Sequence, residues 1–171
     1  MSEETNAAQE AKKRDAALLQ SFRLFQRATQ ENPRDSRSLF GLATVLHRMG
    51  KLQSAESFYR KSLEIQPDNV ECLTNLSILL DDEGRLEEAC CCMERAFTKN
   101  SRDLGVLSNY GHLLCKQNDF TKAEQVLKRA LRLCPTHVLS LHNYACLLWR
   151  KDRDIRKAEE LFAAALRLDP S

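Results

Sequence analysis

The sequence predicts an all-α protein built from repeated helical hairpins, and three observations lead to this prediction. Only 5 Gly and 4 Pro occur among 171 residues, too few turn residues for the short strands of a sandwich or barrel. Pro33, Pro67 and Pro135 are separated by 34 or twice 34 residues, and Pro170 follows 35 later. Apolar residues recur three and four positions apart, which is the spacing of one stripe on a helix.

The 34-residue period divides the chain into an N-terminal segment, 1–35, and four full units, 36–69, 70–103, 104–137 and 138–171. Within the first segment, a partial repeat, residues 7–31 are predicted to form one uninterrupted helix. This helix acts as a cap, because the ends of a stacked array must shield the apolar face of the neighbouring unit.

Each full unit carries two predicted helices. The first has a large apolar stripe, with these members in the four units: Leu39, Leu42 and Leu46; Leu73, Leu76 and Leu80; Leu107, Tyr110 and Leu114; Leu141, Tyr144 and Leu148. Small residues accompany it: Ala43, Ser77, Gly111 and Ala145. The second has a seam of small residues around Tyr59, Met93, Leu127 and Phe162. A small side chain repeated at one position indicates where another helix comes close.

Turn and cap residues occur at equivalent places in the units. The first helices are expected to end at residues that tolerate left-handed backbone: Gly50, Gly84, Asn118 and Asp152. The expected N-caps of the first helices are Asp35, Asn69, Asp103 and Thr136, the last of them one position early. Each unit is therefore predicted to be a helix-turn-helix hairpin.

This combination of period, apolar stripe, small residues and terminal Pro resembles the tetratricopeptide repeat (TPR) over residues 36–171, and partly over 16–35. The sequence departs from the pattern at Ser101, which replaces a Pro, and in the last unit, which has one extra residue. The resemblance implies a right-handed α-solenoid whose first helices line a concave groove that binds peptides.

By the same resemblance, the groove candidates come from the first helix of every unit: Phe40 and Arg48; Asn75, Ile78 and Asp82; Asn109, His112 and Lys116; His142, Asn143, Trp149 and Arg150. Related grooves clamp the carboxyl terminus of heat-shock chaperones with Lys and Arg. Phe40, Gly105 and Asn109 stand at positions where such grooves carry basic residues, so a co-chaperone function is not predicted.

Asn75, Asn109 and Asn143 lie 34 residues apart and are predicted to form a ladder along the groove. An amide side chain both donates and accepts, so it can pair with the main chain of a peptide of any sequence. The alternative is that each Asn bonds within its own unit or to water.

An acidic run, Asp81, Asp82 and Glu83, ends a first helix, where the helix dipole disfavours negative charge. We expect it to pair with Arg48 and Lys116, or alternatively to receive a basic side chain of a bound segment. Trp149 is either an aromatic anchor for a ligand or packed against the second helix of its own unit.

The sequence predicts no metal, no other cofactor and no catalysis. Seven Cys without an export signal indicate reduced thiols. Cys90, Cys91 and Cys92 point in different directions on a helix, which is poor geometry for chelating a metal, and are expected to act as small apolar residues. His142 and Cys146 are four apart and need further ligands to hold zinc. No phosphate loop or nucleophile motif occurs.

The predicted function is a non-catalytic adaptor or scaffold that binds a protein or peptide partner in its groove. A net charge of +2 gives no sign of nucleic-acid binding, no apolar run predicts a membrane span, and an intracellular, cytoplasmic location is expected. The alternatives are an assembly module that works through its edges, or the TPR region of a larger enzyme. The last helix has an excess of apolar residues, which predicts an uncovered edge and self-association: Ile155, Leu161, Phe162, Ala164, Ala165, Leu166 and Leu168.

Overall fold

A computed structural model describes residues 2–151 and 154–169. Within these residues the structure consists of nine α-helices and contains no strand, so the predicted all-α fold is confirmed. The chain divides into two compact units, unit 1 (Met1–Leu79) and unit 2 (Leu80–Ser171). The expected turn at Asp152 and the repeat-ending Pro170 lie outside the described residues.

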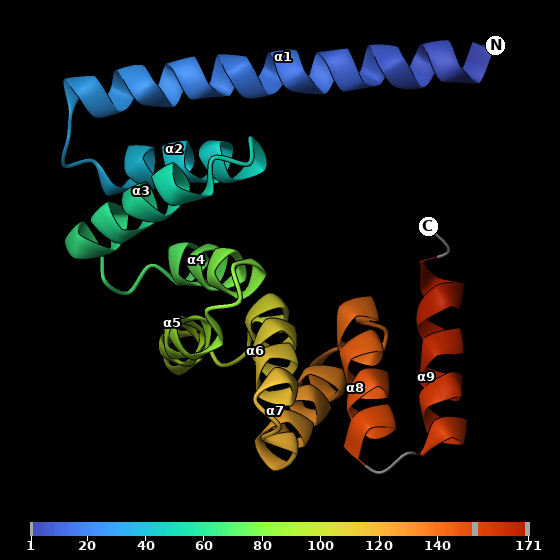
Figure 1. Cartoon of the computed structure of the whole chain (residues 1–171). Coiled ribbons are helices and arrows are strands. Elements are labelled where there is room, and N and C mark those ends of the chain that lie inside the picture. The colour runs from blue at the N-terminus through green and yellow to red at the C-terminus, as the bar shows by residue number, and fades with distance from the viewer. Residues whose placement is uncertain (1, 152–153, 170–171) are drawn as a thin grey trace. The chain divides into compact units, whose positions relative to one another are not determined.

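Unit 1 contains α1 (Ser2–Glu31), α2 (Ser36–Arg48), α3 (Leu52–Ile65) and most of α4 (Val70–Asp82). The predicted N-terminal helix is confirmed and begins at Ser2, five residues earlier than expected. It lies along α2 and continues well past it (Figure 1). A Cβ atom at position 41 would lie 2.3 Å from the Phe25 ring, so Gly41 is what allows α1 to approach α2 this closely.

Unit 2 contains the end of α4 and the helices α5 (Leu86–Lys99), α6 (Leu104–Lys116), α7 (Phe120–Leu133), α8 (Val138–Lys151) and α9 (Ile155–Leu168). The pairs α6–α7 and α8–α9 are helical hairpins, and α8 contacts both helices of the preceding hairpin (Figure 1). This stacking of one hairpin on the next is the solenoid arrangement that the 34-residue period predicts.

The two predicted stripes form the core. Every member of the first-helix stripe is at most 7% exposed, and so are the small residues of both seams. Tyr59, Met93 and Leu127 are fully buried at one repeated position of the second helices. Phe162, the fourth residue of this set, is only half-buried, because it lines a hollow between α8 and α9.

The predicted helix ends are confirmed at three turns. Gly50, Gly84 and Asn118 have φ angles of 72°, 77° and 64°. These angles lie in the left-handed region, which often ends a helix and which Gly and Asn adopt with less steric clash than other residues.

Three of the four predicted N-caps are also confirmed. Side-chain oxygens of Asp35, Asn69 and Asp103 accept backbone N–H bonds from the first turn of the following helix at 2.9–3.3 Å. The prediction of Thr136 as a cap is wrong, because α8 begins after His137, whose ring Nδ1 lies 2.8 Å from the Ser140 hydroxyl.

Candidate functional site

Unit 1 carries four of the predicted groove residues. Ile78 is 38% exposed and Arg48 is exposed, whereas Phe40 is half-buried with its ring centroid 6.1 Å from that of Tyr59. Asn75 is half-buried and lies near the Tyr59 hydroxyl, so its amide is only partly open to a ligand.

Unit 2 carries an ion-pair cluster at the acidic run. The Asp81 carboxylate accepts from the Lys116 ammonium, and its other oxygen lies 3.6 Å from His112 Nε2. Glu83 pairs with Arg85 at 3.2 Å, and Asp82 is exposed. The expected pairing of the run with Lys116 is confirmed for Asp81, while pairing with Arg48 stays a prediction.

His112 lies among other ionisable groups of α6 and α8. Its pKa lies below the usual value, chiefly because burial disfavours the charged imidazolium, although Asp81 opposes this shift. The positive charges of Lys116, His142 and Arg150 lower the pKa further. At neutral pH the imidazole is therefore uncharged and offers one donor and one acceptor to a ligand.

The predicted asparagine ladder is wrong for Asn143. This residue is only 5% exposed, and its Nδ2 donates to the Ser108 carbonyl of α6 at 3.0 Å. Ser108 is fully buried, and the bond closes the contact between α6 and α8. The Asn143 amide therefore joins two helices and does not face a peptide, whereas the half-buried Asn109 stays a candidate.

Trp149 and Arg150 lie at the C-terminal end of α8. Trp149 is 53% exposed and lines a hollow of about 520 Å³ with Arg150, Phe120 and Ile155. The Arg150 guanidinium stacks over the Phe120 ring at 5.8 Å. Trp149 is thus available to a ligand and is not buried against α9.

A second hollow, of about 870 Å³, lies between α8 and α9. Leu139, His142, Phe162 and Leu166 line it, so His142 faces this hollow as well as the His112 cluster. The apolar excess of α9 was the sequence signal that predicted an uncovered edge here. The uncovered edge is confirmed by three large apolar side chains that are 48–63% exposed: Ile155, Leu166 and Leu168.

The cysteines behave mainly as small apolar residues. Cys90 and Cys92 are buried, Cys91 is exposed, and burial raises the pKa of Cys90 to about 11. The His142 ring lies 3.6 Å from Cys146 Sγ, but no three His, Cys, Asp or Glu side chains converge as metal ligands in residues 2–151 and 154–169.

The repeats match known families. Three family models, all described as tetratricopeptide repeat, match residues 36–69, 58–90 and 103–171. The chain belongs to the tetratricopeptide-repeat superfamily. Human Protein O-mannosyl-transferase TMTC3 is 27% identical over 150 residues, which cover 86% of this chain and 16% of that protein. The chain spans between 10% and 56% of the length of the curated relatives that it matches.

Solved structures show the same fold. MamA from Desulfovibrio magneticus RS-1 has a TM-score of 0.79 at 18% identity, covering 97% of this chain and 93% of MamA. YrrB, described as a TPR protein with an unusual peptide-binding site, has a TM-score of 0.74 at 16% identity, covering 93% of this chain and 81% of YrrB.

TPR proteins bind protein or peptide partners, and a role in protein–protein interaction or scaffolding follows for this TPR chain. Among the helices that the structure describes, none is both long and apolar enough to cross a membrane.

Proposed function

We propose that the chain is a non-catalytic adaptor whose unit 2 binds a peptide segment of a partner protein across α6 and α8. One observation carries the proposal: His112 and Lys116 of α6 and His142 and Arg150 of α8 are all exposed, on two helices that contact each other. Exposed side chains grouped in this way on two adjacent helices are typical of a surface that recognises another molecule.

The chemistry of this α6–α8 surface suits a peptide with an acidic side chain. Arg150 supplies positive charge beside the Lys116–Asp81 ion pair, the uncharged His112 can pair with a main-chain amide, and the exposed Trp149 offers an apolar contact. Asn109 stays a main-chain partner in this proposal, and Asn143 does not.

The test uses a random dodecapeptide library displayed on phage and selected on the whole chain. The affinity of selected peptides is then measured for a His112→Ala, Arg150→Ala variant and for an Arg132→Ala control on α7. Loss of two polar contacts should weaken binding by about tenfold to a hundredfold, because each contributes roughly 0.5–1.5 kcal/mol, more if charged. Arg132 is exposed outside this surface, so its variant should bind as the native chain does. Equal affinities for all three proteins would overturn the proposal.

A second candidate is the TPR region of a larger enzyme. The observation favouring it is the match to only 16% of the length of a protein named as a mannosyl-transferase. The molecular mass of the endogenous protein, measured by immunoblot with an antibody against unit 2, tests it. A mass near 19.6 kDa, the mass of this chain, would exclude this candidate.

A further inference from the structure

Helix α9 has an uncovered face. Its counterpart one repeat earlier, α7, contacts both α6 and α8, whereas α9 contacts only α8 among the described helices (Figure 1). The difference appears residue by residue. Leu127 of α7 is fully buried and its counterpart Phe162 is half-buried, while Leu131 is half-buried and its counterpart Leu166 is 63% exposed.

The way α8 covers the α6–α7 hairpin shows what such a face binds. Besides its apolar stripe, α8 contributes polar contacts, among them a bond from Arg150 to the Asn118 side chain at 3.3 Å. The Asn143 amide donates to the Ser108 carbonyl at 3.0 Å, and the Lys151 ammonium donates to Glu124 at 2.7 Å. A covering helix therefore supplies a large apolar stripe, an amide side chain, and a basic residue eight positions after that amide.

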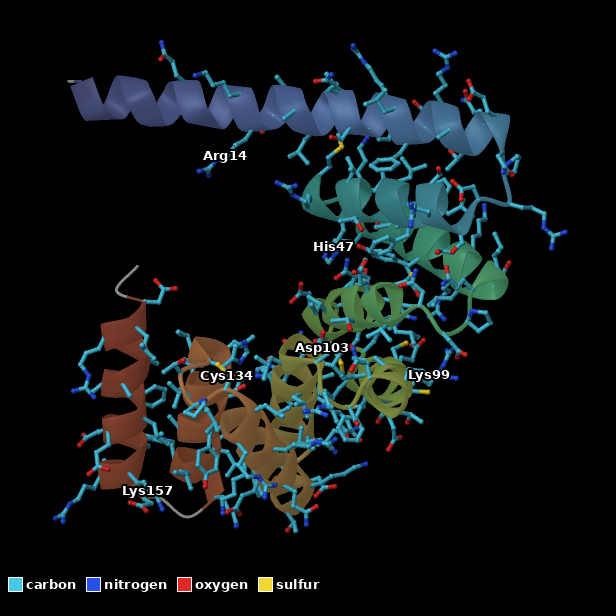
Figure 2. All side chains as sticks on the ribbon, turned by 180° about the vertical axis from the view of Figure 1, so that it is seen from behind. Arg14, His47, Lys99, Asp103, Cys134 and Lys157 are labelled. Carbon is cyan, nitrogen blue, oxygen red and sulfur yellow. The ribbon has the colours of Figure 1, made fainter. Side chains whose placement is uncertain are left out.

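The α8–α9 hairpin carries the matching acceptors. His142 lies 34 residues after Ser108, and the exposed Glu159 lies 35 after Glu124. The hollow of about 870 Å³ begins at His142 and Phe162 and is also lined by Leu139 and Leu166. Figure 2 labels Cys134 beside the start of α8 and Lys157 near the start of α9, which mark opposite ends of this hairpin.

We propose that this α8–α9 face, formed by Leu139, His142, Glu159, Phe162 and Leu166, binds an amphipathic helix of a partner protein. The partner helix inserts large apolar side chains into the hollow, donates an amide to the His142 carbonyl, and pairs a Lys or Arg with Glu159. This is recognition of a helix in a groove, on a face that adjoins the proposed peptide surface at His142 but does not include His112, Lys116 or Arg150.

The sequence of the chain favours a partner protein over a second copy. The residues directly after α2, α4 and α6 are Met49, Glu83 and Gln117, at the position where α8 carries the basic Lys151. In α1, Asn6 and Arg14 have the required spacing of eight residues. Large apolar residues are missing beside them, however, since α1 has Glu4, Ala7 and Ala11 where α8 has Leu141, Tyr144 and Leu148. Only α8 combines all three features, and it is already packed on α6 and α7.

The probe for the test is a fluorescent, end-capped peptide of residues 136–151, the α8 sequence, titrated into the whole chain and followed by anisotropy. Saturable binding is expected. A Leu166→Glu chain should bind about tenfold more weakly or worse, because burying a leucine contributes at least that factor. Leu24 of α1 is also 63% exposed, so a Leu24→Glu chain is the matched control and should bind normally.

A charge exchange makes the test specific. A Glu159→Lys chain should lose about twofold to fivefold in affinity for the peptide, and a Lys151→Glu peptide should restore binding to that chain. No saturable binding, equal effects of the Leu24 and Leu166 substitutions, or no restoration would overturn the proposal. Light scattering that shows the chain forming a dimer, abolished by Leu166→Glu, would assign the face to a second copy and also overturn it. Circular dichroism checks that each variant is folded.

Discussion

The close contact between α6 and α7 depends on Gly111, and replacing this residue tests how the hairpins are packed. A Cβ atom at this position would lie 2.5 Å from both Cγ and Cδ2 of Leu127, which is fully buried. The equivalent positions in two other units hold Ala43 and Ser77. Leu127 branches at Cγ, directly beside the position that the Cβ would take.

Two opposing effects set the magnitude for Gly111→Ala. Overpacking a core costs about 1–3 kcal/mol. Replacing Gly by Ala inside a helix stabilises by about 0.5–1 kcal/mol. We therefore expect a net loss of about 1 kcal/mol in the free energy of unfolding. Urea denaturation followed by circular dichroism should show a lower midpoint with an unchanged slope.

Two further variants isolate the contact. Gly105 lies in the first turn of the same helix, where a Cβ would meet only the Asp103 carboxylate at 3.2 Å, so Gly105→Ala should be neutral or stabilising. In a Leu127→Ala background the clash is gone, and Gly111→Ala should become stabilising. If Gly111→Ala raised stability in the native background as well, the close approach of α6 and α7 would be refuted.

Three more predictions concern single side chains of unit 2. Asn143→Ala should lower the free energy of unfolding by about 0.5–1.5 kcal/mol in thermal denaturation, because the bond from its amide to the Ser108 carbonyl is lost while that carbonyl keeps its donor within α6. Hydrogen bonds from Lys128 and Lys151 lower the pKa of Glu124 to about 2. The ionised Glu124 therefore stabilises the folded chain above pH 4.5, and this stabilisation is lost as the pH falls towards 2. In a Glu124→Gln chain the free energy of unfolding should depend less on pH between 4.5 and 2. Iodoacetamide at pH 8 should modify the exposed Cys91 well before Cys115, whose pKa burial raises to about 11, and mass spectrometry of digests measures the order.

The sequence was sufficient to predict the helices, their ends and most of the core. Apolar spacing of three and four residues defines the buried side of a helix, as at Leu107 and Leu114, and left-handed turns accept only a few residue types, as at Gly84. These signals are local in the chain, so they do not depend on how the hairpins are stacked.

The candidate site depended on contacts between helices and was less predictable. The position of Asn143 in its helix does not tell whether its amide faces a ligand or the carbonyl of Ser108, because the distance between α6 and α8 decides this. In the same way, the approach of Phe25 to Gly41 depends on how α1 lies on α2. The His112 environment is also a product of packing, since Lys116 of α6 and Arg150 of α8 both act on it.

The central claim is that the α6–α8 surface of unit 2 binds a peptide, and amide chemical-shift mapping by NMR tests it most directly. A peptide selected from the random library is titrated into the isotopically labelled whole chain. The account predicts that the largest shifts cluster around His112, Lys116, His142 and Arg150, while α7 residues such as Arg132 hardly change. Shifts confined to α7, or to unit 1, with none around His112 and Arg150, would contradict it.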